Sequence, residues 1–374
     1  MTEMNSAPAR RKVIVLFGGS SGEHEVSCVT AGGVLGALDR ETYEVFAVGI
    51  TRTGRWVLSS DDGRDWQIED GVLPEVPEHG TEVLLPQRQG DRVWRIVDND
   101  GQVQELAEID VVIPLLHGPY GEDGTIQGAL DLLNIPYVGS GVLSSAACMD
   151  KQMMKTILAD AGLPMGRYVT IAPGQWQEDE AGCRERIADL GWPVFVKPAR
   201  AGSSVGISRV TSWDALPAAI EEAHRHDPKL VIEAGIVGRE IECAVLDSPD
   251  NAAPRTSLPG EIIVREGEFY DYESKYVDTS GVELKAPAQL SEDVVAKVQK
   301  LAARAFRAVS AEGLARVDFF VADSGEVLIN EINTMPGFTP FSMYPKLWEV
   351  SGLAFGDLID ELVTLAQQRP VGLR

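Results

Sequence analysis

Three oxygen-bearing side chains lie near one another in the last third of the sequence, on two short strand-like runs. Asp318 belongs to the run 313–320, and Glu331 and Asn333 belong to the run 330–337. Residues two apart on a strand point to the same face, and pairing of adjacent antiparallel strands would bring Asp318 beside the other two. A few such oxygens, completed by phosphate and water, hold magnesium against a nucleotide. We therefore expect a magnesium–nucleotide site here.

Arg316 lies two residues before Asp318 and shares its face of the predicted strand. There it can meet the negative charge that develops on a reacting carbonyl or phosphoryl group. Together with the three oxygen donors, this arginine indicates ATP-dependent chemistry on a small anionic substrate.

A second phosphate-binding pattern follows an apolar run. Lys197 ends that run and precedes a loop rich in glycine and serine, residues 199–206. Glycines let backbone N–H groups approach phosphate oxygens, and a lysine at the end of a strand adds a point charge. The loop is not a Walker A motif, and the H-R-D motif of protein kinases is absent. A solvated lysine beside a flexible turn is an equally good interpretation of this pattern alone.

Four further residues carry weaker signals. Lys151 opens a helix, where the dipole disfavours a cation, so it either faces phosphate or is an ordinary surface lysine. Glu233 and Glu240 could recognise ribose or adenine, although a solvent-facing acid is the commoner case. Glu23 lies in a glycine-rich loop at a helix start, where it could bind an ammonium group or simply cap the helix.

Composition narrows the class of protein. The 374 residues are 44% hydrophobic and 24% charged, which fits two or three globular domains. A net charge of −24 argues against nucleic acid as a partner. The four cysteines show no C-x-x-C spacing, which favours reduced thiols. No apolar run reaches membrane-spanning length, and the run 13–17 is too short for a signal sequence. We expect a cytoplasmic protein with no membrane partner.

The predicted elements alternate in the first part of the chain. Strands at 13–17, 43–50 and 109–116 and a helix at 125–133 indicate an open α/β domain that ends near residue 140. Residues 51–108 are interpreted as a hairpin-bearing insertion with little chemistry.

Strands and helices also position the candidate groups in the rest of the chain. Asp150 caps a predicted helix in which Met153 and Met154 are interpreted as core residues. Strands near 192–198, 207–210 and 230–233 then form a small α+β unit. Beyond residue 239 we expect further strands, a polar loop at 269–279 and an amphipathic helix at 294–309.

Seven segments of this sequence, taken in order, resemble the D-alanine–D-alanine ligases of the ATP-grasp superfamily. They are GGSSGEHEVS (18–27), HGPYGEDGTIQG (117–128), YVGSGVLSSAACMDK (137–151), VKPARAGSSVG (196–206), YDYESKY (270–276), LARVDFF (314–320) and NEINTMPGFTPFSMYP (330–345). The insertion and the tail beyond about residue 350 carry little of the resemblance.

The resemblance implies an α/β (α+β) fold with a three-domain ATP-grasp architecture. Residues 1–139 would form the N-terminal open parallel α/β domain, which includes the insertion at about 51–108 and the first-substrate loop. Residues 140–233 would form the central ATP-grasp subdomain. Residues 234–374 would form the C-terminal ATP-grasp and catalytic domain. A homodimer is also expected from the family.

The resemblance further implies a reaction. The carboxylate of one D-alanine attacks the γ-phosphate of ATP to give an acyl phosphate, and the amine of a second D-alanine displaces phosphate, which supplies a peptidoglycan precursor. Residues expected to contact ATP are Lys151, Lys197, Glu233, Glu240 and Lys275. Two magnesium ions, with manganese as an alternative metal, would be held by Asp318, Glu331 and Asn333.

The remaining roles concern the substrates and the intermediate. Arg316 and the N–H of Gly337 would stabilise the tetrahedral oxyanion. Residues expected to bind or position the two D-alanines are Glu23, Ser203 and Tyr276 for the first, and Ser342, Lys275 and Met343 for the second. The loop 269–283 would close over the acyl phosphate and exclude water. His117 matches a histidine of the family near the first substrate, although a structural role is as good an interpretation.

Two alternatives compete with this hypothesis. A ligase that uses D-lactate or D-serine as second substrate would share most of these residues, but Tyr276 favours D-alanine. A catalytically silent ATP-binding module would be expected to lose metal ligands or the arginine, and Arg316, Asp318, Glu331 and Asn333 are all present.

Overall fold

The computed structural model describes residues 9–202, 204–249, 252–264 and 282–369. The chain divides into two compact units. The first unit comprises Met1–Leu116, Gln127–Val138 and Phe355–Arg374, and the second unit comprises His117–Ile126 and Gly139–Ala354. The three proposed domains remain a prediction, because the division into two units does not test their limits.

A single sheet forms the centre of the first unit, with the order β6-β5-β4-β3-β2-β1-β7. Strands β1 (Arg11–Gly18), β2 (Tyr43–Ile50) and β7 (Val111–Pro114) are parallel. Residues 13–17 of β1 are fully buried, as expected of a strand covered on both faces. The helices of this unit are α1 (His24–Ala37), α2 (Thr125–Leu133) and α11 (Phe355–Gln368), with a 3-10 turn η1 (Gly63–Trp66).

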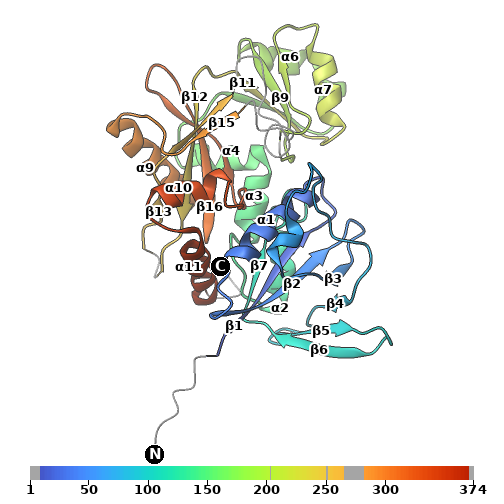
Figure 1. Ribbon diagram of the computed structural model, residues 1–374. Helices are drawn as coiled ribbons and strands as arrows, with labels where there is room; N and C mark the ends of the chain where they lie inside the picture. The colour runs from blue at the N-terminus through green and yellow to red at the C-terminus, as the bar shows by residue number, and fades with distance from the viewer. Residues whose placement is uncertain (1–8, 203, 250–251, 265–281, 370–374) are drawn as a thin grey trace, which may run out of the picture. The chain divides into compact units, whose positions relative to one another are not determined.

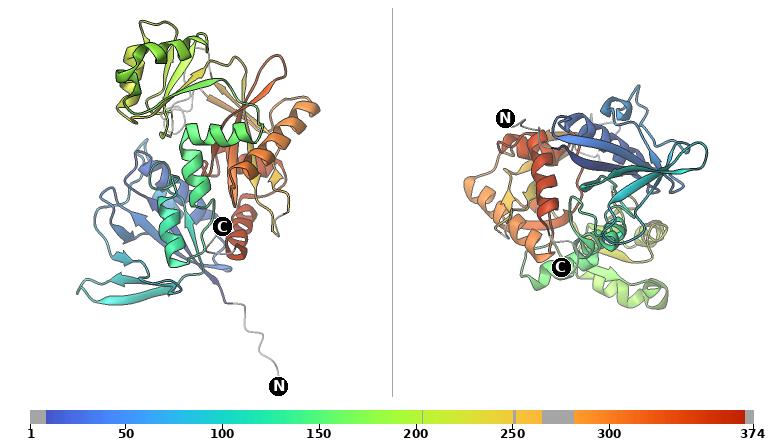
Figure 2. Two further views of the ribbon diagram at one scale, coloured as in Figure 1. Left: turned by 180° about the vertical axis from the view of Figure 1, so that it is seen from behind. Right: turned by 90° about the horizontal axis from the view of Figure 1, so that it is seen from below.

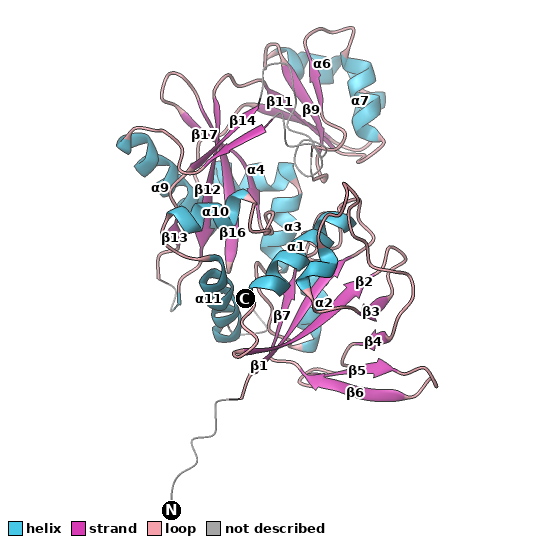
Figure 3. Ribbon diagram, in the orientation of Figure 1, coloured by secondary structure: helices cyan, strands magenta, loops and turns pink. Residues whose placement is uncertain are grey.

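The insertion extends this sheet. Strands β3 (Trp56–Leu58), β4 (Glu82–Leu84), β5 (Val93–Val97) and β6 (Val103–Glu108) pair antiparallel in succession beyond β2. The expected hairpin is β5–β6, which forms the free edge of the sheet (Figure 3).

The second unit contains two further sheets among its described residues. The four-stranded sheet has the order β10-β9-β11-β8 and consists of β8 (Tyr168–Ile171), β9 (Val194–Pro198), β10 (Ser208–Val210) and β11 (Leu230–Ala234). Its core also takes side chains from α6 (Glu180–Ala188) and α7 (Leu216–His224), and the short helix α5 (Gln175–Glu178) precedes α6. This part of the chain is green to yellow in Figure 1.

The other sheet carries the predicted metal ligands. Its order is β15-β14-β12-β16-β17, and β13 pairs with β12. The strands are β12 (Arg239–Leu246), β13 (Arg255–Thr256), β14 (Gly260–Val264), β15 (Val282–Lys285), β16 (Leu314–Val321) and β17 (Val327–Asn333). Helix α9 (Glu292–Ala308) lies along this sheet (orange in Figures 1 and 2) and buries Val298, Leu301 and Phe306. The remaining helices are α3 (Val142–Met149), α4 (Lys151–Asp160) and α10 (Met343–Val350).

The two methionines of α4 differ in burial. Asp150 caps this helix as expected, with its carboxylate accepting from the N–H groups of Gln152 and Met153. Met154 is fully buried, but the prediction that Met153 is a core residue is wrong, since its exposed fraction is 47%. The buried stripe of α4 runs through Met154, Lys155 and Leu158, and Met153 lies about 100° away from Met154 around the helix.

No helix in the described part of the chain is long and apolar enough to cross a membrane.

Candidate active site

Strands β16 and β17 bring the predicted metal ligands together. They pair antiparallel with Asp318 opposite Glu331 and Arg316 opposite Asn333. The strand pairing expected from the sequence is therefore confirmed. The pairing register of β16 and β17 shifts by one residue directly after Asp318. The pairs Arg316–Asn333 and Asp318–Glu331 therefore lie just before an irregularity in the sheet.

Charges and hydrogen bonds connect this group closely. Arg316 donates from Nε and Nη2 to the two oxygens of Asp318, both at 2.7 Å, and Asn333 donates from Nδ2 to Asp318 Oδ2 at 2.9 Å. Arg316 Nε also lies 3.2 Å from Oε2 of Glu242, whose side chain is 4% exposed. The arginine thus stands between two carboxylates and is shielded from solvent.

Glu242 was not anticipated from the sequence. It lies on β12 directly opposite Asp318, so β12 contributes a third strand to the group. A signal was available, because Glu240 and Glu242 are two apart in an otherwise apolar run and must share one face of the strand.

The donor set fits magnesium in its chemistry. Carboxylate oxygens of Asp318 and Glu331 and an amide oxygen of Asn333 are the hard donors that this ion prefers. Among the described residues there is no cluster of three or more His, Cys, Asp and Glu side chains arranged to hold a metal ion. The predicted set has only two residues of these four types, Asp318 and Glu331, because its third donor is the amide of Asn333. A metal ion would therefore compete with Arg316 for the oxygens of Asp318, and it would need the oxygen rather than the nitrogen of the Asn333 amide.

The predicted phosphate-binding lysine is held by a buried carboxylate. Lys197 Nζ at the end of β9 lies 2.7 Å from Glu233 Oε2 on β11, and the two side chains are 13% and 12% exposed. The interpretation of Lys197 as a solvated lysine, and of Glu233 as a solvent-facing acid, is therefore wrong. A second lysine, Lys155, lies 3.0 Å from the other oxygen, Glu233 Oε1, and sequence reasoning missed it.

The charges of this cluster shift the pKa values in it. Burial alone would raise the pKa of Glu233, but Lys197 and Lys155 outweigh it and lower the pKa to about 2. Burial opposes the charge on Lys197, and Glu233 raises its pKa nonetheless. Glu240, on β12 opposite Phe320, also acts on Lys197 in the same direction. Glu233 and Lys197 are therefore both charged at neutral pH.

Lys151 connects the two groups electrostatically. Its Nζ donates to the backbone oxygen of Ala201, in the glycine-rich loop, at 2.7 Å. Burial lowers its pKa, which the charge of Glu331 opposes and that of Lys197 reinforces. This cation is thus close enough to feel both the predicted metal ligand and the predicted phosphate-binding lysine.

The segment after β17 brings Gly337 and Ser342 together. A Cβ atom on Gly337 would lie 3.1 Å from Ser342 Oγ. Thr339 fixes this hydroxyl, with its Oγ1 at 2.8 Å and its backbone N–H donating at 3.2 Å. Met343, 5% exposed, packs against β14, since a Cβ on Gly260 would lie 2.7 Å from Met343 Sδ. Its place beside a substrate stays a prediction.

In the first unit, a different glycine-rich loop leads into α1 and contains Glu23. It is held by His24, the next residue. The side chain of Glu23 makes no capping hydrogen bond to α1, although the residue stands at the N-cap position. His24 is fully buried, and its Nε2 accepts from the N–H of Val76 at 3.0 Å while Nδ1 lies 2.6 Å from the carbonyl oxygen of Gly19. Because the N–H of Val76 can only donate, Nδ1 carries the proton and donates to Gly19. Because the Glu23 side chain makes no hydrogen bond to the start of α1, the interpretation of Glu23 as a simple helix cap finds no support.

Four expected site residues remain: Ser203, Lys275, Tyr276 and His117. Ser203, Lys275 and Tyr276 lie outside the described residues, as does most of the loop 269–283. His117 is buried with its Nδ1 3.8 Å from Glu122 Oε1, and this carboxylate also accepts from the N–H of Gly118 at 2.8 Å. Both contacts lie within the turn that contains His117, and its place near the first substrate stays a prediction.

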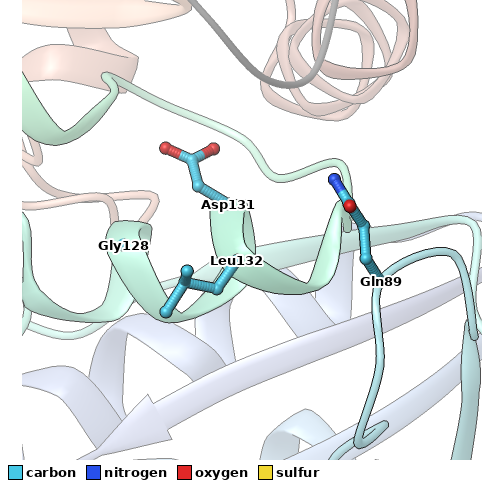
Figure 4. A pocket seen from close by; sticks show the side chains of 4 residues that line it. All are labelled: Gln89, Gly128, Asp131 and Leu132. Carbon is cyan, nitrogen blue, oxygen red and sulfur yellow. The ribbon is translucent and has the colours of Figure 1, made fainter.

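The first unit also has a surface hollow. It is lined by Gln89, Gly128, Asp131 and Leu132 (Figure 4). None of these residues is expected to contact nucleotide or substrate.

Comparison with known proteins decides the family. Residues 12–140 match the model of the D-ala D-ala ligase N-terminus, and residues 157–364 match that of the D-ala D-ala ligase C-terminus. The chain belongs to the D-alanine–D-alanine ligase family. It is therefore a ligase with the ATP-grasp fold.

Individual members of the D-alanine–D-alanine ligase family match almost the whole chain. The D-alanine–D-alanine ligase of Paenarthrobacter aurescens is 56% identical over 367 residues, which cover 98% of this chain and 97% of the relative. The solved D-alanine–D-alanine ligase of Coxiella burnetii has a TM-score of 0.81 at 38% identity, covering 96% of this chain and 94% of that one. A D-Ala:D-Ser ligase from Enterococcus faecalis has the same TM-score of 0.81 at 34% identity, covering 96% and 100%.

Proposed function

We propose that this ligase joins two D-alanine molecules into D-alanyl-D-alanine at the expense of ATP, for the synthesis of a peptidoglycan precursor. The observation that carries the proposal is the group on β16 and β17, where Arg316 and Asp318 stand opposite Asn333 and Glu331. A catalytically silent relative would have little reason to retain an arginine held between two buried carboxylates, because such charges are costly to bury.

The reaction proceeds in two steps. A carboxylate oxygen of the first D-alanine attacks the γ-phosphorus of ATP, the bond to the bridging oxygen breaks, and ADP leaves. The amine of the second D-alanine then attacks the carbonyl carbon of the acyl phosphate. The tetrahedral intermediate expels phosphate, the nitrogen loses a proton, and the peptide bond remains.

Cations and hydrogen-bond donors of this chain stabilise the charge in both steps. Two magnesium ions, or manganese, would be held by Asp318, Glu331 and Asn333 and would neutralise phosphoryl oxygens. Arg316 would turn from Asp318 to the oxyanion that forms at the carbonyl carbon, where the N–H of Gly337 also donates. The nucleotide would be bound by Lys151, Lys197, Glu233, Glu240 and Lys275.

The two amino acids are bound through their charged groups. Glu23 pairs with the ammonium group of the first D-alanine, in a network with Ser203 and Tyr276. Ser342 and Lys275 receive the carboxylate of the second D-alanine, and Met343 borders its methyl group. Support for this assignment comes from Thr339, which fixes the Ser342 hydroxyl beside Gly337. A homodimer in the cytoplasm is the proposed state of the enzyme, which light scattering after size-exclusion chromatography would test.

A coupled phosphate-release assay tests the proposal. With ATP, magnesium and D-alanine, the protein is expected to release phosphate and to form a product with the mass of D-alanyl-D-alanine, whereas L-alanine should give neither. Nucleotide binding without any ligated product would contradict the proposal and leave a silent ATP-binding module.

Competition between acceptors tests the second substrate. The similarity to a D-Ala:D-Ser ligase makes a competition experiment with D-serine necessary. D-Alanine mixed with an equal concentration of D-serine or D-lactate should still give D-alanyl-D-alanine as the main product near neutral pH. With D-lactate as the competitor, raising the pH should favour D-alanine further, because its amine must lose its proton before it attacks. D-Serine also attacks through an amine, so its share of the product should change little with pH. A mixed product that favours D-serine or D-lactate would reassign the second site.

A further inference from the structure

The proposed function assigns no role to Lys155, although this residue has one of the most buried charges in the described part of the second unit. Only 2% of its side chain is exposed, and its Nζ lies 3.0 Å from Glu233 Oε1. A lysine is almost never buried to this degree without a partner, because its ammonium group loses hydration. The ion pair with Glu233 accounts for its burial.

The structure leaves Lys155 little freedom to move. Its Nζ also lies 3.4 Å from the backbone oxygen of Asn330 and 5.5 Å from the centre of the Tyr168 ring. Its neighbours on α4, Met154 and Leu158, are fully buried and fix the helix face. Lys155 therefore links β11 to β17 at the residue that precedes the predicted metal ligand Glu331.

Lys197, the other partner of Glu233, is in a different situation. It stands at the end of β9, directly before the glycine-rich loop, and holds Glu233 Oε2 at 2.7 Å. Phosphate oxygens that arrive at this loop compete with Glu233 for the Lys197 ammonium group. If Lys197 turned to them, Lys155 would remain as the cation in direct contact with this carboxylate, whose side chain is 12% exposed. A buried carboxylate without any cation beside it is strongly unfavourable, because it has lost its hydration.

We propose that Lys155 is a positioning residue for the nucleotide base: it holds the Glu233 carboxylate charged and oriented while Lys197 binds phosphate. This inference rests on the proposed function, in which Glu233 lies near adenine. Lys155 itself does not touch the nucleotide. The carboxylate that it holds can accept a hydrogen bond from the 6-amino group of adenine, whereas the 6-oxo group of inosine triphosphate offers no such donor.

The Lys155→Met variant tests this role, because methionine keeps much of the side-chain length and removes the charge. The KM for ATP is expected to rise about tenfold or more, while the KM for D-alanine changes by less than about twofold. The preference for ATP over inosine triphosphate in kcat/KM should also fall about tenfold. A purely structural lysine would lower the melting temperature and leave this preference unchanged.

Two further variants sharpen the test. Arg304 donates to the carbonyl oxygen of Ala161 at the other end of α4, so Arg304→Met loosens the same helix without touching Glu233 and should keep the nucleotide preference. In a double variant Lys155→Met with Glu233→Gln, the KM for ATP should be no higher than in the worse single variant, because both changes remove one function. If Lys155→Met does not fold, Lys155→Gln takes its place.

The outcomes separate this inference from the proposed function. Unchanged nucleotide preference in the Lys155 variant, or independent multiplication of the two effects in the double variant, would overturn the role of Lys155. A wild-type protein that binds ATP but ligates nothing would instead overturn the proposed function. Calorimetric titration of the variants with ATP and inosine triphosphate would still test Lys155 in that case.

Discussion

At the scale of single residues, this site is defined by which charges share a partner. Asp318 gives its two oxygens to Arg316, and Glu233 divides its two oxygens between Lys197 and Lys155. In both groups a buried carboxylate holds a cation that the proposed reaction needs elsewhere. Binding of metal and nucleotide would therefore exchange partners within existing ion pairs, which avoids leaving any charge buried alone.

The Asp318→Asn variant should lose activity while it keeps its fold. Asparagine has the same shape, but it cannot carry the negative charge that magnesium and Arg316 require. We expect kcat to fall about a thousandfold or more, measured by phosphate release. Asp323→Asn, in the exposed turn of the same hairpin, is the matched control and should retain full activity. Near-normal turnover of Asp318→Asn would refute the metal-site assignment.

Glu233 should contribute stability that depends on pH. Its pKa in the folded protein, about 2, is below the ordinary value of 4.5, so the contribution is complete above pH 4.5 and disappears as the pH falls towards 2. This difference corresponds to about 3 kcal/mol. The free energy of unfolding in urea should therefore be higher for the wild type than for Glu233→Gln at pH 7, and the gap should narrow below pH 4.5. A constant gap down to pH 3 would contradict the ion-pair account.

At the scale of elements, helix α10 is fixed to the sheet by a close approach to β14. A Cβ on Gly260 would meet Met343 Sδ at 2.7 Å and Leu347 Cδ2 at 2.8 Å. The Gly260→Ala variant should therefore displace the start of α10, where Ser342 lies, and destabilise the protein by about 1–3 kcal/mol. The KM for the second D-alanine should rise more than the KM for ATP. Gly36→Ala on α1, where a Cβ meets nothing within 4 Å, is the control. Equal effects on both KM values would argue against this link.

At the scale of the whole molecule, the last helix of the chain, α11, belongs to the first unit, which is otherwise built from the first 138 residues. Helix α11 buries Leu358, Leu362 and Val363 and contacts α1 and β7, more than 200 residues earlier in the sequence. Leu362→Ala should cost about 2–5 kcal/mol and should speed hydrogen exchange of amides in β1 and β7, leaving β16 protected. Gln367→Ala, exposed on the same helix, should change neither. Equal deprotection in both units would show that the units do not unfold separately.

The sequence predicted those features that follow from short-range periodicity. The cap at Asp150 and the bounds of α2 depend on spacing within a few residues, and the facing of Asp318 and Glu331 depends on the pairing of two strands that follow one another in the sequence. The structure confirms all three. Lys155 was missed because a lysine on a helix reads as surface until the strand that carries Glu233 is placed against it. The packing of α11 could not be predicted from local spacing either, because its partners α1 and β7 lie far from it in the sequence. Burial of a charge is a property of the assembled sheets, and no local pattern reports it.

The most direct test of the central claim is ligation of D-alanine that carries oxygen-18 in its carboxylate, with dipeptide and phosphate both analysed by mass. The proposed reaction transfers one carboxylate oxygen of the first D-alanine to phosphorus, and that oxygen leaves with the phosphate. We therefore predict D-alanyl-D-alanine together with phosphate that contains one labelled oxygen per molecule formed. Dipeptide accompanied by unlabelled phosphate would contradict the acyl-phosphate route, and labelled phosphate without dipeptide would contradict the assignment of the second substrate.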